Sequence, residues 1–279
     1  MDIKGITGDA VKYPLSDWKK LLILGIIILI TGITGVATTL GATNIYLVSI
    51  LAIFGFIIGF LVNGYMFRIV RSSLNGVAKL PEFKHWIDMG IDGLKVFITF
   101  IVYSIPVILI ISIFTPVFFD SNTALVWGIN PLELLIGSLN SVILPEIWSL
   151  TALLYDLSLS SPEGIFAIIM GLLYLIIITP IFLVAIANMA YYDGEFRSAF
   201  RFREVFDEIS SIGWIKLIKW YVTTGILFLI LFIIITNIIA YIFSLAHLSI
   251  GGELLVSLIV APYFYMFFAR SMALYYMPD

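Results

Sequence analysis

The sequence contains no cysteine among its 279 residues, and its histidines are His85 and His247 alone. The lack of cysteine excludes disulfides, thiolate metal ligands and cysteine nucleophiles. Charged residues are also scarce, at 12% of the chain, whereas soluble domains carry about a quarter. Such a chain has too little charge to cover the surface of a soluble protein.

Apolar and aromatic residues are abundant instead. The sequence is 61% hydrophobic, with 22 phenylalanines, 14 tyrosines and 6 tryptophans. Disordered chains and coiled coils do not carry so much apolar mass, so both classes are excluded. The composition indicates an integral membrane protein, which we expect to reside in the cell membrane.

Long uncharged runs predict the membrane spans. A hydrocarbon core of about 30 Å requires about 20 apolar residues in a helix. Five runs reach this length: Leu21–Leu40, Ile45–Phe67, Val96–Phe119, Ile165–Tyr192 and Trp220–Ala246. A shorter run, Leu254–Ala269, lies between Glu253 and Arg270, whose charges can reach the two headgroup layers. The sequence therefore predicts an all-α bundle of six transmembrane helices.

The basic residues predict the orientation of these spans. All 15 lysines and arginines precede the first run, follow the last, or lie between runs two and three or four and five. Loops rich in Lys and Arg stay in the cytoplasm. We therefore expect both termini in the cytoplasm and the segment 120–164 outside.

Three copies of one helical hairpin are recognisable along the chain. Lysines occupy the same place ahead of the odd-numbered spans, at Lys20, Lys95 and Lys216. We interpret residues 1–279 as one membrane domain made of hairpins 1–76, 77–194 and 195–279. All three run in the same direction, so they are expected to be parallel repeats around an axis along the membrane normal.

The even-numbered spans share a polar position. A glycine or proline that allows the helix to bend is followed, eight residues later, by Asn63, Asn188 or Arg270. If equivalent positions face the axis, these three side chains form a polar ring that binds an anionic small molecule or lipid headgroup. The alternative is that the amides hydrogen-bond to neighbouring helices and Arg270 extends to lipid phosphates.

Two segments ahead of the odd-numbered spans have helical apolar spacing. These segments are Phe83–Leu94 and Phe202–Ile212, and charges occupy their opposite faces. The pattern is typical of amphipathic helices that lie on the cytoplasmic membrane surface. A soluble loop with one buried face is the alternative.

The external insertion, residues 120–164, interrupts the repeat. It contains two apolar stretches that are too short to span, Pro131–Leu144 and Glu146–Leu159. They predict two short helices in the outer leaflet. Such a segment covers the bundle or takes part in binding, and the sequence does not distinguish these roles.

Several segments carry a family resemblance. They are YPLSDWKKLL at residues 13–22, GYMFRIVRSSLNG at 64–76, LPEF at 80–83 and DGLK at 92–95. The chain resembles a family of multi-pass membrane proteins of unknown function that is common in archaea. The resemblance implies a membrane protein and brings no activity with it.

Known catalytic motifs are missing from the sequence. It has no phosphate-binding loop, no His-Glu-x-x-His and no Gly-x-Ser-x-Gly. We therefore predict no enzyme activity, no catalytic residues, no metal, no cofactor and no nucleic-acid partner. Two functions stay open. One is a transporter-like bundle that handles lipid or a small anion, and the other is a non-catalytic membrane scaffold that binds other proteins.

Overall fold

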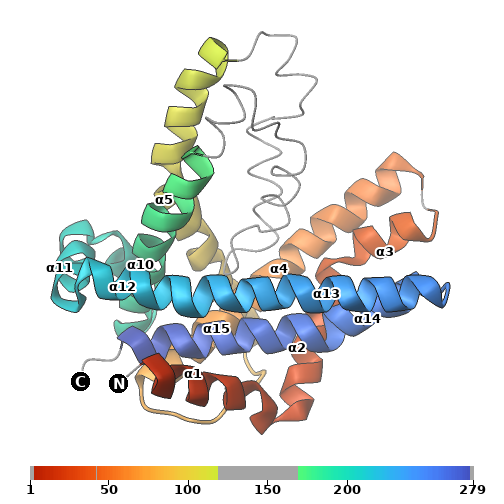
Figure 1. The fold of residues 1–279 in the computed structure, drawn as a ribbon, viewed down its shortest axis with the longest axis horizontal. Helices are drawn as coiled ribbons and strands as arrows, with labels where there is room; N and C mark the ends of the chain where they lie inside the picture. Colours follow the sequence, from red (N-terminus) through yellow and green to blue (C-terminus); the bar gives the residue numbers. More distant parts are fainter. Residues whose placement is uncertain (1–2, 42, 119–168, 277–279) are drawn as a thin grey trace.

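The structure of the protein is a computed structural model that describes residues 3–41, 43–118 and 169–276 (Figure 1). Every element in these ranges is helical, so the predicted all-α class is confirmed. The elements are α1 (Ile3–Lys12), η1 (Tyr13–Ser16), α2 (Trp18–Thr31), α3 (Ile33–Thr39), α4 (Ile45–Leu74), α5 (Trp86–Phe118), η2 (Tyr174–Ile178), α10 (Thr179–Tyr191), η3 (Phe196–Phe200), α11 (Phe202–Ile212), α12 (Trp214–Trp220), η4 (Tyr221–Ile226), α13 (Leu227–Leu245), α14 (Ser249–Leu255), η5 (Val256–Val260) and α15 (Ala261–Tyr276). The predicted short helices Pro131–Leu144 and Glu146–Leu159 lie outside the described residues.

Five helical stretches are long and apolar enough to cross a membrane. They are Ile45–Leu74, Trp86–Ile110, Ile169–Tyr191, Trp214–Leu245 and Ile250–Tyr276. The predicted first span, Leu21–Leu40, is instead divided into α2 and α3. The division falls at Gly32, whose φ of −85° and ψ of 8° depart from the helix and whose lack of a side chain weakens helix formation. Neither piece alone reaches the length of a span.

Three helices form the centre of the packing. The helices α4, α10 and α15 contact one another in pairs, while α2 packs on α4 and α15, and α5 packs on α4 and α10. Figure 1 shows α1 alongside α15, near both chain ends. The central helices supply most of the fully buried apolar side chains, including Tyr65, Met66, Phe67, Ala185, Met189 and Phe267.

The backbones of α4 and α5 come into direct contact at two glycines. A β-carbon at Gly64 would lie 1.8 Å from the Met89 carbonyl oxygen, and one at Gly93 would lie 1.8 Å from the Phe60 carbonyl oxygen. No side chain fits at these distances, so only glycine permits the crossing.

The first predicted interfacial helix, Phe83–Leu94, is not a separate element. Residues 77–85 are not helical, and α5 begins at Trp86 and runs through Leu94 into the span without a break. The contact of Gly93 with α4 explains this difference, because it holds the first turns of α5 in line with the rest of the helix.

The second predicted segment, Phe202–Ile212, is helix α11 with the predicted bounds. Gly213 ends it with a φ of 90°, a conformation that favours glycine. Val205 and Ile209 are fully buried against the protein, whereas Phe202 and Phe206 are nearly half exposed. Its place on the membrane surface stays a prediction.

The glycine crossing yields a stability test. We expect Gly64→Ala to lower the free energy of unfolding by about 1–3 kcal/mol or more, because an added methyl must force the two backbones apart. Gly59→Ala on the same helix is the matched control, since no atom lies within 4 Å of the position of its β-carbon. Thermal unfolding of the purified chain in detergent measures both. Equal midpoints for the two variants would contradict the tight crossing.

Candidate functional site

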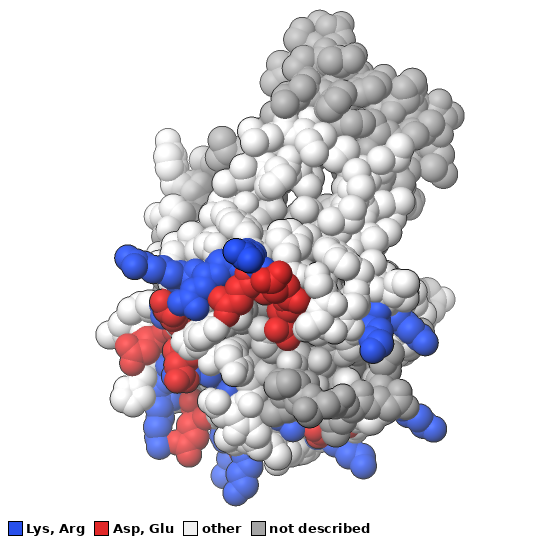
Figure 2. Space-filling view, turned by 90° about the vertical axis from the view of Figure 1, so that its left-hand side faces the viewer, with Lys and Arg blue, Asp and Glu red and all other residues white. Residues whose placement is uncertain are grey.

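The charged side chains gather at one end of the molecule. Figure 2 shows the lysines, arginines and acids on the lower part of one face, while the described residues of the upper part are uncharged. Cations at this end include Lys20 at the start of α2, Arg68 and Arg71 near the end of α4, and Lys95 in α5. A charge close to a bilayer needs partners that stabilise it. The contacts of these cations therefore indicate where a binding site can form.

Arg270 is the most deeply buried of these cations, with 5% of the residue exposed. Its Nη2 donates to Asp9 Oδ2 at 2.9 Å, and its Nη1 donates to the Val77 carbonyl at 3.0 Å. The guanidinium carbon also lies 4.9 Å from the centre of the Tyr13 ring. Arg270 therefore joins the last helix to α1, to η1 and to the turn after α4.

Among the described residues, two buried hydrogen-bond donors at this place have no partner. Within the described ranges, neither Arg270 Nε nor Ser73 Oγ makes a hydrogen bond. Burial raises the pKa of Tyr13, and the charge of Arg270 offsets part of the rise, because the guanidinium lies over the phenol ring. An unpaired buried donor costs about 1–3 kcal/mol. This corner thus keeps hydrogen-bonding capacity for a group that is rich in acceptors.

The other two residues of the predicted ring are also buried. Asn188 donates to the Ser198 carbonyl at 3.0 Å and accepts from the Tyr276 hydroxyl at 3.2 Å. Asn63 is 6% exposed. In the part of the chain that the structure describes, no hydrogen bond joins any two of Asn63, Asn188 and Arg270. Their helices pack in pairs, but Arg270 and Asn188 are held by separate partners. A shared ring stays a prediction.

Lys20 and Lys95, which the sequence places in equivalent positions, make the same pair of contacts. Lys20 Nζ donates to the Leu80 carbonyl at 2.7 Å and lies 3.6 Å from Asp17. Lys95 Nζ donates to the Gly194 carbonyl at 3.0 Å and lies 3.3 Å from Asp92. Lys20 thus fixes the segment after α4, and Lys95 fixes the turn after α10.

The third lysine, Lys216, differs from the other two. It is exposed, and Gly213 stands where the other copies have an aspartate. Among the described residues it forms no ion pair.

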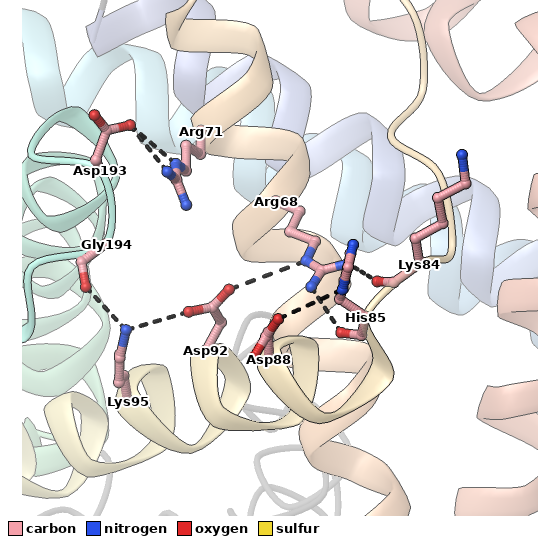
Figure 3. A network of polar contacts seen from close by, with 9 residues as sticks. All are labelled: Arg68, Arg71, Lys84, His85, Asp88, Asp92, Lys95, Asp193 and Gly194. Carbon is pink, nitrogen blue, oxygen red and sulfur yellow. Dashed lines mark hydrogen bonds and ion pairs between the residues drawn. The ribbon is translucent and has the colours of Figure 1, made fainter.

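A network of charges connects α4, α5 and the turn after α10 (Figure 3). Arg68 donates to the carbonyls of Lys84 and His85, and its Nε lies 4.0 Å from Asp92. Asp92 in turn pairs with Lys95. The sequence identified these residues only as charges on the cytoplasmic side. Their pairing depends on the α4–α5 crossing, which brings distant segments together.

On the other side of this network, Arg71 binds a single carboxylate. Its Nε and Nη2 lie 3.1 and 3.0 Å from Asp193 Oδ1. Asp193 has a φ of 54°, which is uncommon outside glycine. Two consecutive left-handed residues, Asp193 and Gly194, therefore direct this carboxylate toward α4.

Sequence reasoning missed Asp9 as the partner of Arg270. A signal for it was present, because Ile6, Ala10 and Tyr13 follow helical spacing and all three are buried. That pattern predicts a packed helix with Asp9 beside its apolar face. Over the described ranges, no group of three or more His, Asp or Glu side chains is arranged to hold a metal.

Comparison with known proteins gives one match. The sequence profile of the family described as "Protein of unknown function (DUF4013)" matches residues 47–243. None of the curated proteins and none of the solved structures matches the chain. The match covers α4, α5, α10, α11 and most of α13, and it leaves out Asp9 and Arg270.

The Asp9–Arg270 pair yields a test of the buried contact. We expect Asp9→Asn to lower the free energy of unfolding by about 1–3 kcal/mol, because it removes the counter-charge of a buried guanidinium. Glu82→Gln is the control, since Glu82 and its partner Lys84 are mostly exposed and such pairs contribute little. Chemical unfolding in detergent compares the variants with the unmodified chain. An equal loss of unfolding free energy in both variants would show that the buried pair contributes no more to stability than the exposed pair.

Proposed function

We propose that this chain, which belongs to the DUF4013 family of proteins of unknown function, is a six-span membrane protein that binds an anionic group at its basic end. The anionic group is a lipid headgroup or a small anion, and the bundle is transporter-like or handles lipid. We propose binding rather than catalysis, and we infer no cofactor.

The contact between Asp9 and Arg270 supports six spans. It brings the N-terminal helix α1 against the last helix α15. Segments on the same side of a membrane are connected by an even number of crossings. The stretch formed by α2 and α3 then serves as the first crossing, with the break at Gly32 inside it. The clustering of lysines and arginines at this end supports a cytoplasmic location for both termini.

Two recurring features support the three-hairpin repeat. The contacts of Lys20 with the Leu80 carbonyl recur at Lys95 with the Gly194 carbonyl. The π-helical turns η2 and η5 also begin and end at the same distances ahead of Pro180 and Pro262. Equivalent positions in the proposed hairpins thus share local structure as well as residue type.

The observation that carries the proposed binding role is the unused donor capacity around Arg270. The guanidinium is buried, and its Nε and the nearby Ser73 Oγ are unpaired in the described part of the chain. Phosphate and carboxylate groups supply the acceptors that such donors require. Asp9 is 39% exposed at its side chain, which provides a route from solvent to the pair.

A second candidate, a membrane scaffold, rests on a different observation. Both Nη atoms of Arg270 already donate within the protein, to Asp9 and to Val77. A cation that is satisfied in this way can serve to lock α1 against α15. In that case the basic end is a rigid platform, and its partners bind elsewhere.

The proposed orientation is tested by labelling in this cysteine-free chain. Ser210 in α11 and Thr43 ahead of α4 are both exposed. In intact cells, we expect a cysteine at Thr43 to react with an impermeant maleimide and a cysteine at Ser210 to react only after lysis. Labelling of the Ser210→Cys variant from outside, with protection of Thr43→Cys, would show the opposite orientation.

The proposed binding is tested with short-chain phosphatidylglycerol and with inorganic phosphate. A ligand that binds the folded state raises the unfolding midpoint. We expect this rise in the unmodified chain, a smaller rise in Ser73→Ala, and a still smaller one in the double variant Asp9→Asn/Arg270→Gln, which leaves no charge unpaired. Arg203→Gln is the control for general charge, because its side chain is 97% exposed. Equal midpoint rises in all variants would favour the scaffold.

A further inference from the structure

Gly194 lies in the turn after α10, close to the end of α4 and the start of α5. Gly194 has a φ of 84°, and a β-carbon there would lie 3.6 Å from the Phe67 ring. The same point is 3.8 Å from Lys95 Nζ and 3.9 Å from Arg71 Nη1. Two cations from different helices therefore approach one position that has no side chain of its own.

Both cations have donors to spare. Arg71 uses Nε and Nη2 for Asp193, and Nη1 has no partner among the residues that the structure describes. Figure 3 shows this third nitrogen pointing away from Asp193. Lys95 donates to Asp92 and to the Gly194 carbonyl, which occupies two of its three N–H groups. Each side chain can thus supply one more charge-assisted hydrogen bond.

Three cations close to this position contact fewer carboxylates than there are cations. Arg68, Arg71 and Lys95 face the two carboxylates of Asp92 and Asp193. The side chains of the three cations are between 18% and 38% exposed, so their field is screened less than in bulk water. One cationic charge remains to be compensated at the boundary between the apolar helices and the charged end.

We propose that Arg71 Nη1 and Lys95 Nζ, which approach each other beside Gly194, are the donors of a phosphate-binding site. The ligand is a phosphate group, either in the headgroup of an anionic lipid or as free phosphate. Glycine is favoured at this position because the backbone is left-handed, and it places no side chain between the two donors. This site is separate from that at Arg270, and it stands whether or not Arg270 binds an anion.

Asp193 has a defined role in this proposal. Its carboxylate orients the guanidinium of Arg71 through two donors and leaves the third nitrogen for the ligand. The same carboxylate repels an incoming anion. Asparagine retains the acceptor oxygen and tolerates the left-handed conformation, so Asp193→Asn separates the two effects.

The test measures the affinity of the full-length purified chain for short-chain phosphatidylglycerol, with phosphatidylcholine and inorganic phosphate as comparisons. We expect Arg71→Gln to weaken binding of phosphatidylglycerol by about tenfold, as the loss of one charge-assisted hydrogen bond predicts. Arg203→Gln, which removes the same charge from an exposed position, should change it by no more than about twofold. Asp193→Asn should strengthen binding by about threefold.

The outcomes separate the sources of phosphate and the competing explanations. Binding of phosphatidylglycerol without inorganic phosphate identifies a lipid headgroup, and binding of both identifies phosphate itself. Equal losses in Arg71→Gln and Arg203→Gln would overturn the site, because general electrostatics would then explain binding. If Arg71→Gln fails to fold, Asp193→Asn decides alone, and unchanged or weaker binding in that variant overturns the proposal. The double variant Asp9→Asn/Arg270→Gln should keep this response, which distinguishes it from the site at Arg270.

Discussion

The arrangement of the basic end depends on one requirement, which is that the buried guanidinium of Arg270 needs partners. Arginine does not lose its charge on burial, so the fold must bring acceptors to it. Asp9 comes from the first helix and the Val77 carbonyl from the turn after α4. As a result, segments separated by most of the chain converge on α15. The position of α1, the path of the turn and the packing of Tyr13 all follow from this one charge.

The other cations at this end obey the same rule with backbone acceptors. Lys20, Lys95 and Arg68 all donate to backbone carbonyls in the segments that connect the helices. The cations therefore stabilise the turns, while the turns keep the charges at the membrane boundary. Arg71 differs from these three cations, because among the described residues it binds the side chain of Asp193 and no carbonyl.

The sequence predicts helices better than it predicts contacts between side chains that are distant along the chain. Apolar runs and helical periodicity depend on neighbouring residues, so they predicted α4, most of α5 and the exact bounds of α11. The break at Gly32 was missed because hydropathy does not detect a local weakness of the helix. Asp9 was missed for a different reason. Its partner is 261 residues away in the sequence, and only the packing of α1 on α15 brings them together.

The prolines illustrate how a local defect determines long-range packing. Pro180 and Pro262 have no N–H to donate to the carbonyls four residues earlier, and a π-helical turn precedes each of them. The carbonyl that Pro262 leaves is that of Leu258. A β-carbon at Gly25 would lie only 2.2 Å from this oxygen, so α2 packs directly on the widened turn. Because Gly25 has no side chain, α2 can pack closely against the irregular backbone of η5. A larger residue at Gly25 would separate α2 from η5, and it would expose that carbonyl where neither lipid nor water can satisfy it.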